Sequence, residues 1–246
     1  MIKTVYLTVI CLLSCSNLLH AQKAPAWGGG ADVTDLSFGF SFTYVSSYLK
    51  INKQPDWQLP FIDPETGRTV TGEIASISSP DAPGFAVGFL TRYRINDHLE
   101  VRTTPSLVFA DRKLIYKYQD ATVEDKVRQI TTTAFDIPLQ LKLKSDRIGD
   151  FRGYLIGGAK ITAGIGSKKN DDKSKDLIDK LVKTQQYFAS YEAGIGLDIY
   201  FEFFKLSPEI KISNSFGNIL RPENHPYSRP LSGLALHTVQ FSLYFE

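Results

Sequence analysis

The sequence predicts an all-β fold, an antiparallel up-and-down β-barrel of about eight strands with long extracellular loops that crosses an outer membrane. Three observations predict it. Apolar and polar residues alternate with a period of two along most of the chain, short and long connections take turns between the alternating segments, and the N-terminus has the layout of an export signal. Together they indicate an exported protein that enters a membrane as strands.

Residues 1–21 form the predicted signal peptide. Lys3 supplies a short positive segment, residues 5–13 are apolar, and Ala21 is a small residue suited to cleavage. The apolar run is too short for a membrane-spanning helix, so we expect removal of the segment after Ala21. The alternative is lipoprotein processing at Cys15, because a Leu-Leu-Ser run precedes that cysteine.

The mature chain begins with a predicted flexible periplasmic stub, residues 22–32, and residues 33–246 form the predicted barrel domain. Both cysteines, Cys11 and Cys15, fall inside the signal peptide, so we expect no disulfide, thiolate catalysis or cysteine-ligated zinc. The net charge of +2 gives no broad basic field, so we expect no nucleic-acid partner.

Eight segments of the chain alternate with a period of two. They are 36–44, 85–95, 99–109, 135–142, 151–165, 191–201, 209–216 and 238–245. In a strand, alternate side chains point to opposite faces, so each segment has one apolar, often aromatic face and one small, polar or charged face. Tyr154 and Ile156 blur this pattern in the fifth segment. Paired glycines such as Gly194 and Gly196 are expected to relieve crowding within strands.

The connections between these segments alternate in length. The short ones are 96–98, 145–150 and 202–205, and the long polar ones are 50–82, 111–126, 167–186 and 217–232. Short turns on one side and long loops on the other are typical of bacterial outer-membrane barrels, and both termini then lie on the periplasmic side. Residues 177–182 have helical apolar spacing, which allows a short amphipathic helix packed on its own loop or docked to a partner.

A soluble β-sandwich is the competing fold, since it also has period-two strands. Charges on the non-aromatic face of nearly every segment oppose it. In a narrow barrel these charges must neutralise one another, so they predict a salt-bridged network that fills the lumen. A gated or proton-linked pathway is the other interpretation. The predicted lumen residues are Arg92, Arg94, Glu100, Arg102, Asp136, Lys142, Arg152, Lys160, Glu192, Asp198, Glu209 and Lys211.

Motifs for catalysis, phosphate binding or metal binding are absent from the sequence, so we expect no enzyme activity, cofactor or metal. The mature histidines His98, His225 and His237 fall in a turn, a loop and the last strand, so they cannot converge on one ion in a small barrel. His237 is predicted to face lipid near the outer rim. A lipid-modifying enzyme would use it with a serine, but no serine stands two residues further on.

The long first loop contains Trp57 and Phe61 among several prolines. Such a loop either presents a docking surface for a partner or packs over the barrel mouth, and the sequence leaves both interpretations open.

From residue 103 onward the chain resembles the PorT family, also called SprT, which consists of Bacteroidota barrels of the type IX secretion system. The matching segments are TPSLVFADR (104–112), FDIPLQLK (135–142), DFRGYLIGG (150–158), DIYFEFFKLSPE (198–209) and FSLYFE (241–246). The chain departs from the family at Asp150 and Gly153, where the family tends to have Asn and Pro. Its last strand also resembles the terminal signal that barrel-assembly machinery reads, although Glu246 replaces the usual final Phe.

The resemblance implies a non-enzymatic outer-membrane component that is needed to export cargo with a conserved C-terminal domain, and in some members for gliding. It implies other secretion components as partners and no catalytic residues. The narrow barrel favours an accessory or assembly role over a conduit. A structural or adhesion-type small barrel and a lipid-modifying enzyme that uses His237 are the two alternative functions.

Overall fold

A computed structural model of the chain describes residues 34–120, 123–165 and 176–246. The predicted signal peptide, its cleavage site after Ala21, the alternative processing site at Cys15 and the stub 22–32 lie outside the described residues. Within these described ranges, no helix is both long enough and apolar enough to cross a membrane.

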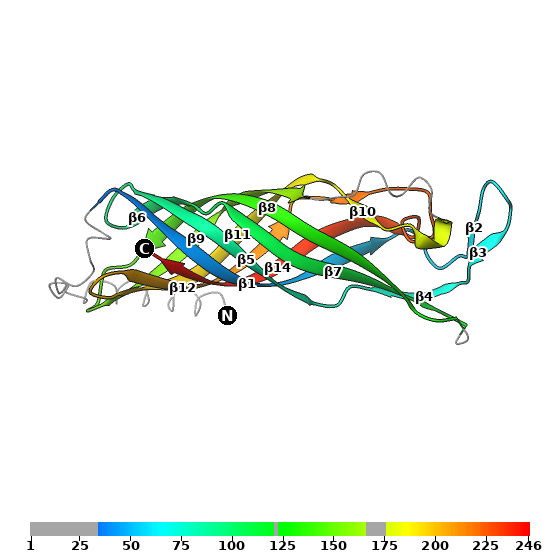
Figure 1. Ribbon diagram of the computed structural model, residues 1–246, viewed down its shortest axis with the longest axis horizontal. Helices are drawn as coiled ribbons and strands as arrows, with labels where there is room; N and C mark the ends of the chain where they lie inside the picture. Colours follow the sequence, from blue (N-terminus) through cyan, green and yellow to red (C-terminus); the bar gives the residue numbers. More distant parts are fainter. Residues whose placement is uncertain (1–33, 121–122, 166–175) are drawn as a thin grey trace, which may run out of the picture.

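Eight antiparallel wall strands close into one ring (Figure 1), which confirms the predicted all-β barrel. In ring order they are β1 (Leu36–Lys53), β5 (Ala82–Arg94), β6 with β7 (Leu99–Thr103 and Ser106–Tyr118), β8 (Lys126–Lys144), β9 (Phe151–Ile165), β11 (Tyr187–Tyr200), β12 (Lys205–Ser215) and β14 (Leu231–Phe245). Pairing of β1 with both β14 and β5 closes the ring.

Strands β6 and β7 are two halves of one wall strand. Both of them pair with β5 on one side and with β8 on the other. The ladder is interrupted at Thr104 and Pro105, since proline has no N–H to donate, and the Pro105 carbonyl accepts the N–H of Phe89 at 3.0 Å instead. This bond keeps β5 joined to the wall at the point where β6 ends and β7 has not yet begun.

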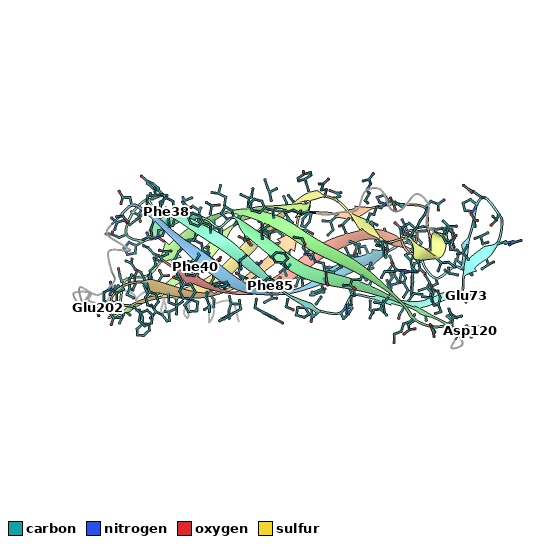
Figure 2. All side chains as sticks on the ribbon, in the orientation of Figure 1. Phe38, Phe40, Glu73, Phe85, Asp120 and Glu202 are labelled. Atoms are coloured by element: carbon teal, nitrogen blue, oxygen red, sulfur yellow. The ribbon has the colours of Figure 1, made fainter. Side chains whose placement is uncertain are left out.

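The two faces of the wall separate as the period-two pattern predicts. Phe38, Phe40 and Phe85 stand on the outside of the barrel (Figure 2) and are each more than half exposed to the surroundings. The register aligns such residues across strands: Tyr44 lies opposite Phe241, which lies opposite Ile210. An apolar, aromatic-rich band therefore surrounds the barrel and matches the acyl chains of a bilayer.

Short turns and the C-terminus lie at one end of the barrel, and long connections lie at the other (Figure 1). The wall strands continue past the apolar band at the long-loop end: β1 runs to Lys53, β7 to Tyr118, and β8 begins at Lys126. The sequence predicts loops for much of these stretches. The reason is that the outer face of a strand in water does not need apolar residues, so the alternation fades.

Smaller elements cover the long-loop end. They are the hairpin of β2 (Phe61–Ile62) and β3 (Thr69–Thr71), the strand β4 (Ile74–Ser78) on the edge of β7, and the pair of β10 (Lys183–Thr184) with β13 (Leu220–Arg221). The short amphipathic helix that the apolar spacing of residues 177–182 allows does not form. Only one 3₁₀ turn, Leu177–Asp179, forms, because the following residues extend to pair with β13 while Val182 is buried among loop residues.

Arginine placed in the apolar band tests the assignment of the two faces. We expect Phe241→Arg to lower the free energy of unfolding by about 2–4 kcal/mol, because the charge would enter the hydrocarbon region. Urea unfolding in lipid vesicles, followed by tryptophan fluorescence, measures this loss. Gln129→Arg is the control: Gln129 is exposed on β8 beyond the band and faces Asp111, so its loss should stay below about 1 kcal/mol. Equal losses would contradict the position of the band.

Candidate functional site: the charged lumen and its covered mouth

The interior of the barrel is filled with ionised side chains. Buried cations and carboxylates alternate around the inner wall, and among the described residues the cations outnumber the carboxylates. The buried cations are Arg92, Arg102, Arg112, Lys142, Lys144, Lys160, Lys205 and Lys211, and the carboxylates are Glu100, Asp136, Glu192, Asp198, Glu209 and the side chain of Glu246. Removal of this many charges from water is tolerated only when they pair with one another.

Ten of the twelve lumen residues expected from the sequence lie in this interior: Arg92, Glu100, Arg102, Asp136, Lys142, Lys160, Glu192, Asp198, Glu209 and Lys211. Arg94 and Arg152 do not, which corrects their assignment. Arg94 is a quarter exposed and pairs with Asp35 at 3.1 Å, and Arg152 donates to the carbonyl of Ser145 at 2.8 Å. Both stand where strands meet the short turns, and their long side chains reach the rim.

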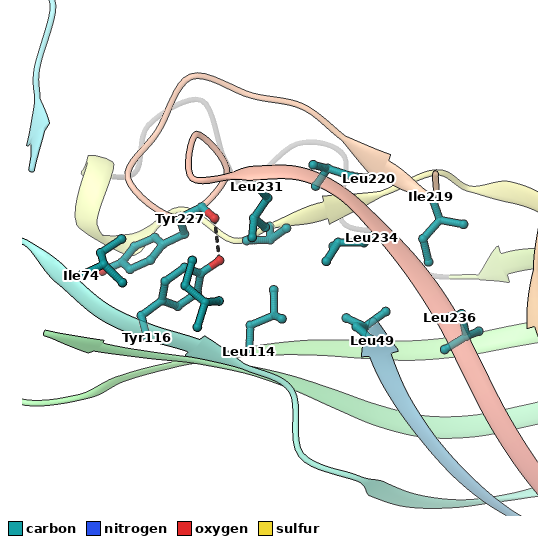
Figure 3. Close-up of a cluster of buried hydrophobic side chains, with 12 residues drawn as sticks. Leu49, Ile74, Leu114, Tyr116, Ile219, Leu220, Tyr227, Leu231, Leu234 and Leu236 are labelled. Carbon is teal, nitrogen blue, oxygen red and sulfur yellow. Dashed lines mark hydrogen bonds between the residues drawn. The ribbon is translucent and has the colours of Figure 1, made fainter. Parts of the chain in front are cut away.

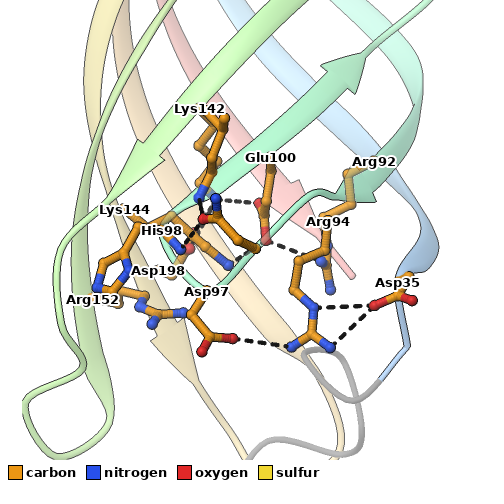
Figure 4. A network of polar contacts seen from close by, with 12 residues as sticks. Asp35, Arg92, Arg94, Asp97, His98, Glu100, Lys142, Lys144, Arg152 and Asp198 are labelled. Carbon is orange, nitrogen blue, oxygen red and sulfur yellow. Dashed lines mark hydrogen bonds and ion pairs between the residues drawn. The ribbon is translucent and has the colours of Figure 1, made fainter.

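The network nearest the short turns centres on Glu100 (Figure 4). Glu100 accepts from Arg92 at 3.0 Å and from Lys144, so it joins β5 to β8. Lys142 lies 2.8 Å from both carboxylate oxygens of Asp198, whose Oδ1 also accepts from Ser207 at 2.6 Å. Each cation on one wall strand thus has a carboxylate on another.

Glu246, the last residue of the sequence, belongs to the same network. Its side chain turns inward and binds Arg92 of β5 at 2.7 Å and Lys205 of β12 at 2.5 Å. Its backbone also exchanges two hydrogen bonds with Lys205. Since β14 and β1 lie between β12 and β5 in the ring, this one carboxylate ties together the strands on either side of the closing pair.

A second network fills the middle of the barrel around Glu209. Glu209 accepts from Arg102 at 2.6 Å and from the hydroxyls of Tyr154 and Tyr244 at 3.0 and 3.2 Å. The guanidinium of Arg102 also lies over the Tyr244 ring, with 4.3 Å between its carbon and the ring centroid. Lys211 stands 3.5 Å from the same carboxylate. Two tyrosines and two cations therefore saturate one buried charge.

Lys160 and Asp136 extend the network toward β8 and β9. Their ion pair measures 3.0 Å, and Thr162 donates to the other oxygen of Asp136 at 2.7 Å. Gln140 links this part to the Glu209 network: it accepts from Arg102 at 2.8 Å and donates to Glu192.

Tyr154, which blurred the pattern of its segment in the sequence, is an interior residue. Its ring lies under the ammonium of Lys142 at 3.8 Å and packs over Gly196, where a Cβ would overlap the ring. Gly196 is therefore required by a close approach inside the lumen. The period of two would have identified Tyr154, because it shares its face with Lys160.

Four buried charged residues are not among the lumen residues predicted from the sequence. They are Arg112, Lys144, Lys205 and Glu246. Arg112 and Lys144 continue the inward positions of β7 and β8 by one or two steps past the segments taken as strands. Lys205 and Glu246 are the first and last residues beside the short-turn end, where strand limits are hardest to place. Longer strands would have revealed the first two.

A small cavity lies in the middle of the barrel interior. Its volume of about 20 Å³ is room for one or two water molecules, and Asp136, Lys160 and Glu192 are among the side chains that line it. The buried ion networks around it occupy the lumen, as expected for a ring of eight strands.

The long-loop end is closed by apolar side chains (Figure 3). The cluster joins inward residues of the wall to residues of β4, of the connection before β10 and of the last loop. Its buried members are Leu49, Ile74, Ile77, Leu114, Tyr116, Val182, Ile219, Leu220, Tyr227, Leu231, Leu234 and Leu236. The Tyr116 hydroxyl donates to the Tyr227 carbonyl at 2.5 Å, and Arg128 donates to the Tyr227 hydroxyl at 2.7 Å. These bonds hold the loop between β12 and β14 inside the mouth.

The two aromatic residues proposed for docking take part in this closure. Phe61 is only 3% exposed, and Trp57 is half-buried against the apolar cluster, with the ammonium of Lys53 3.8 Å above its ring. Of the two interpretations of this loop, the geometry favours packing over the mouth. Beyond Phe61, the β2–β3 turn is ordered by Asp63, whose pKa is lowered because Thr66 and the Glu65 N–H donate to its carboxylate.

The three histidines lie apart. His98 pairs with Asp146 at the short turns, His225 is buried in the mouth, and His237 is on the outer wall beside Asn214. Within the parts of the chain that the structure describes, no cluster of three His, Cys, Asp or Glu residues has a geometry for a metal ion.

These features define a small outer-membrane β-barrel with a filled interior. The chain matches the family described as "Outer membrane protein beta-barrel domain" over residues 21–221, and it belongs to this family. No curated protein sequence matches it.

Several solved structures are similar to this chain at the level of fold. OprG from Pseudomonas aeruginosa is 12% identical, with 85% of this chain and 93% of that chain covered and a TM-score of 0.47. Ail, the attachment invasion locus protein of Yersinia pestis, is 13% identical, with 86% and 99% covered and a TM-score of 0.38. Neisserial surface protein A is 12% identical, with 86% and 98% covered and a TM-score of 0.38.

Removal of the Glu246 charge tests whether its ion pairs stabilise the closure of the barrel at β1 and β14. We expect Glu246→Gln to destabilise the barrel by about 3 kcal/mol, because Arg92 and Lys205 then remain buried without their shared carboxylate. The temperature at which the folded band disappears on SDS gels reports the change. Arg94→Gln at the rim is the control and should cost less than about 1 kcal/mol. An unchanged transition in Glu246→Gln would show that this ion pair does not hold the ring.

Truncation of Tyr227 tests the closure of the mouth. We expect Tyr227→Ala to speed cleavage after Glu223 by a glutamate-specific protease about tenfold or more, because the loop loses its bonds to Tyr116 and Arg128 and opens more often. Gel analysis of timed digests measures the rate. Tyr187→Ala, on the outer wall, should leave it unchanged. The same rate in both variants would mean that Tyr227 does not hold the loop.

Proposed function

We propose that this outer-membrane barrel is a non-enzymatic accessory or assembly component of type IX protein secretion, and that it acts by contacts with other secretion components. The single observation that carries the accessory role is the closed interior. Ion pairs fill the half near the short turns, and the Tyr227 loop and its apolar cluster fill the mouth. Exported cargo has no path through such a lumen, so the role belongs to the surfaces of the barrel.

The link to secretion is supported by the resemblance to the PorT family. Its most specific segment, residues 198–209, includes Asp198, Lys205 and Glu209, which lie in the two ion networks. The resembling segments thus include residues on which the packed interior depends. The apolar outer wall gives the protein the bilayer as its first partner, and its last strand makes barrel-assembly machinery the expected partner during insertion.

An adhesion-type barrel is the second candidate. The β2–β3 hairpin stands beyond the end of the wall (Figure 1). Ile62 on the hairpin and Leu59 just before it are more than half exposed. An ordered, projecting loop with exposed apolar side chains is suited to binding a partner outside the cell.

A clean deletion of the gene tests the secretion role. We expect cargo with the conserved C-terminal domain to accumulate inside the deletion strain and to return to the medium when the wild-type gene is restored. Immunoblots of culture medium and periplasm against one such cargo measure the distribution. Normal secretion in the deletion strain, with the growth of both strains matched, would eliminate the role.

Two further variants separate the alternatives. Replacement of residues 59–72 by a short Gly-Ser linker should leave secretion intact if the hairpin serves adhesion, and binding to surfaces should fall. His237→Ala should leave the lipid profile of the outer membrane unchanged, since no enzyme activity is proposed; an altered profile in mass spectrometry of extracted lipids would favour the lipid-modifying alternative. The heat-modifiable gel band confirms that each variant folds.

A further inference from the structure

A row of polar side chains crosses the outer wall where the apolar band ends. Tyr48 of β1 lies opposite His237 of β14, which lies opposite Asn214 of β12. One row nearer the short turns, Val239 and Ile212 are apolar and about 40–50% exposed. On the other side of the polar row stand Lys50 and Ala235. This row therefore marks the level at which the wall passes from acyl chains to headgroups.

The imidazole of His237 is held in place by its two neighbours. Its Nδ1 lies 2.6 Å from Oδ1 of Asn214, and its ring centroid lies 4.9 Å from that of Tyr48. An amide oxygen accepts, so Nδ1 carries the proton and donates it. Among the residues that the structure describes, Nε2 of His237 has no hydrogen-bond partner. With the proton on Nδ1, Nε2 carries a lone pair and is left to accept a hydrogen bond from a ligand.

Lys50 supplies a cation beside this acceptor. It is exposed on the same face of β1 as Tyr48, about 7 Å further along the strand, which is within reach of a lysine side chain. No ion pair of Lys50 forms within the described part of the chain. Asp81 is an exposed carboxylate directly before β5, whose first residue Ala82 lies opposite Ser47 of β1.

We propose that His237, Asn214, Tyr48 and Lys50 form a binding site for the phosphate group of an outer-leaflet lipid. Nζ of Lys50 would donate to a phosphate oxygen, and Nε2 of His237 would accept from the P–OH of a phosphate monoester. Asn214 orients the imidazole, and Tyr48 supports its ring. The lipid's acyl chains then lie along the apolar rows formed by Val239, Phe241 and their neighbours. Charge-assisted bonds to phosphate are strong where water is partly excluded, as it is at this level. This site is independent of the secretion role.

Binding of a phosphate monoester lipid to the purified full chain tests the proposal. The chain in a neutral detergent is titrated with phosphatidic acid or with phosphatidylcholine of the same acyl chains, and native mass spectrometry measures the bound fraction. The variant is Lys50→Gln with His237→Gln. The matched control is Lys113→Gln, an exposed lysine on the outward face of β7. The heat-modifiable gel band shows that each variant is folded before titration.

We expect wild type and Lys113→Gln to bind phosphatidic acid equally and the double variant to bind it at least about tenfold more weakly. Asp81→Asn should bind as tightly as wild type or more tightly, because a nearby negative charge is removed. Equal binding by wild type and the double variant, or equal loss in Lys113→Gln, would overturn the site. An excess of inorganic phosphate should leave the lipid bound; displacement at equal concentrations would show a site for free phosphate and would overturn the assignment to lipid.

Discussion

Pairing of buried charge is the constraint on which the rest of this barrel depends. The wall of a β-barrel is a single sheet. Along each strand, side chains therefore point alternately to the lipid and to the lumen. Eight strands leave no room for bulk water inside, and ionised side chains there are stable only against opposite charges. Glu100, Asp198 and Glu209 each meet cations from other strands. The ion pairs therefore join the strands and fill the space together.

Pairing of buried charge also explains how the register between β1 and β14 is held. A barrel made of one chain must join its first strand to its last, and backbone hydrogen bonds alone would allow these two strands to slide by a register step. Glu246 prevents this because its carboxylate lies between Arg92 of β5 and Lys205 of β12. On the lipid face of the same strand, Phe245 supplies an outward aromatic ring that stacks on Phe40.

A lumen closed by charge at one half and by apolar packing at the other leaves the outer surfaces for function. The hairpin beyond the mouth, the short-turn rim and the wall at headgroup level are the surfaces available to partners or lipids. The cover of the mouth is made by a loop that must find its place after the strands pair, since Tyr227 meets Tyr116 across more than a hundred residues of sequence.

The sequence by itself determined which residues face lipid and which face inward, because a period of two follows from strand geometry and needs no tertiary information. Most lumen charges, including Arg102 and Glu209, were readable in this way. Contacts between distant strands, in contrast, depend on the tertiary structure. Tertiary structure determines which charges pair across the ring. It also places the side chain of Arg94 at the rim and that of Phe61 over the mouth. It also placed His237 beside Asn214 and Tyr48. These outcomes depend on register between distant strands, which local alternation does not encode.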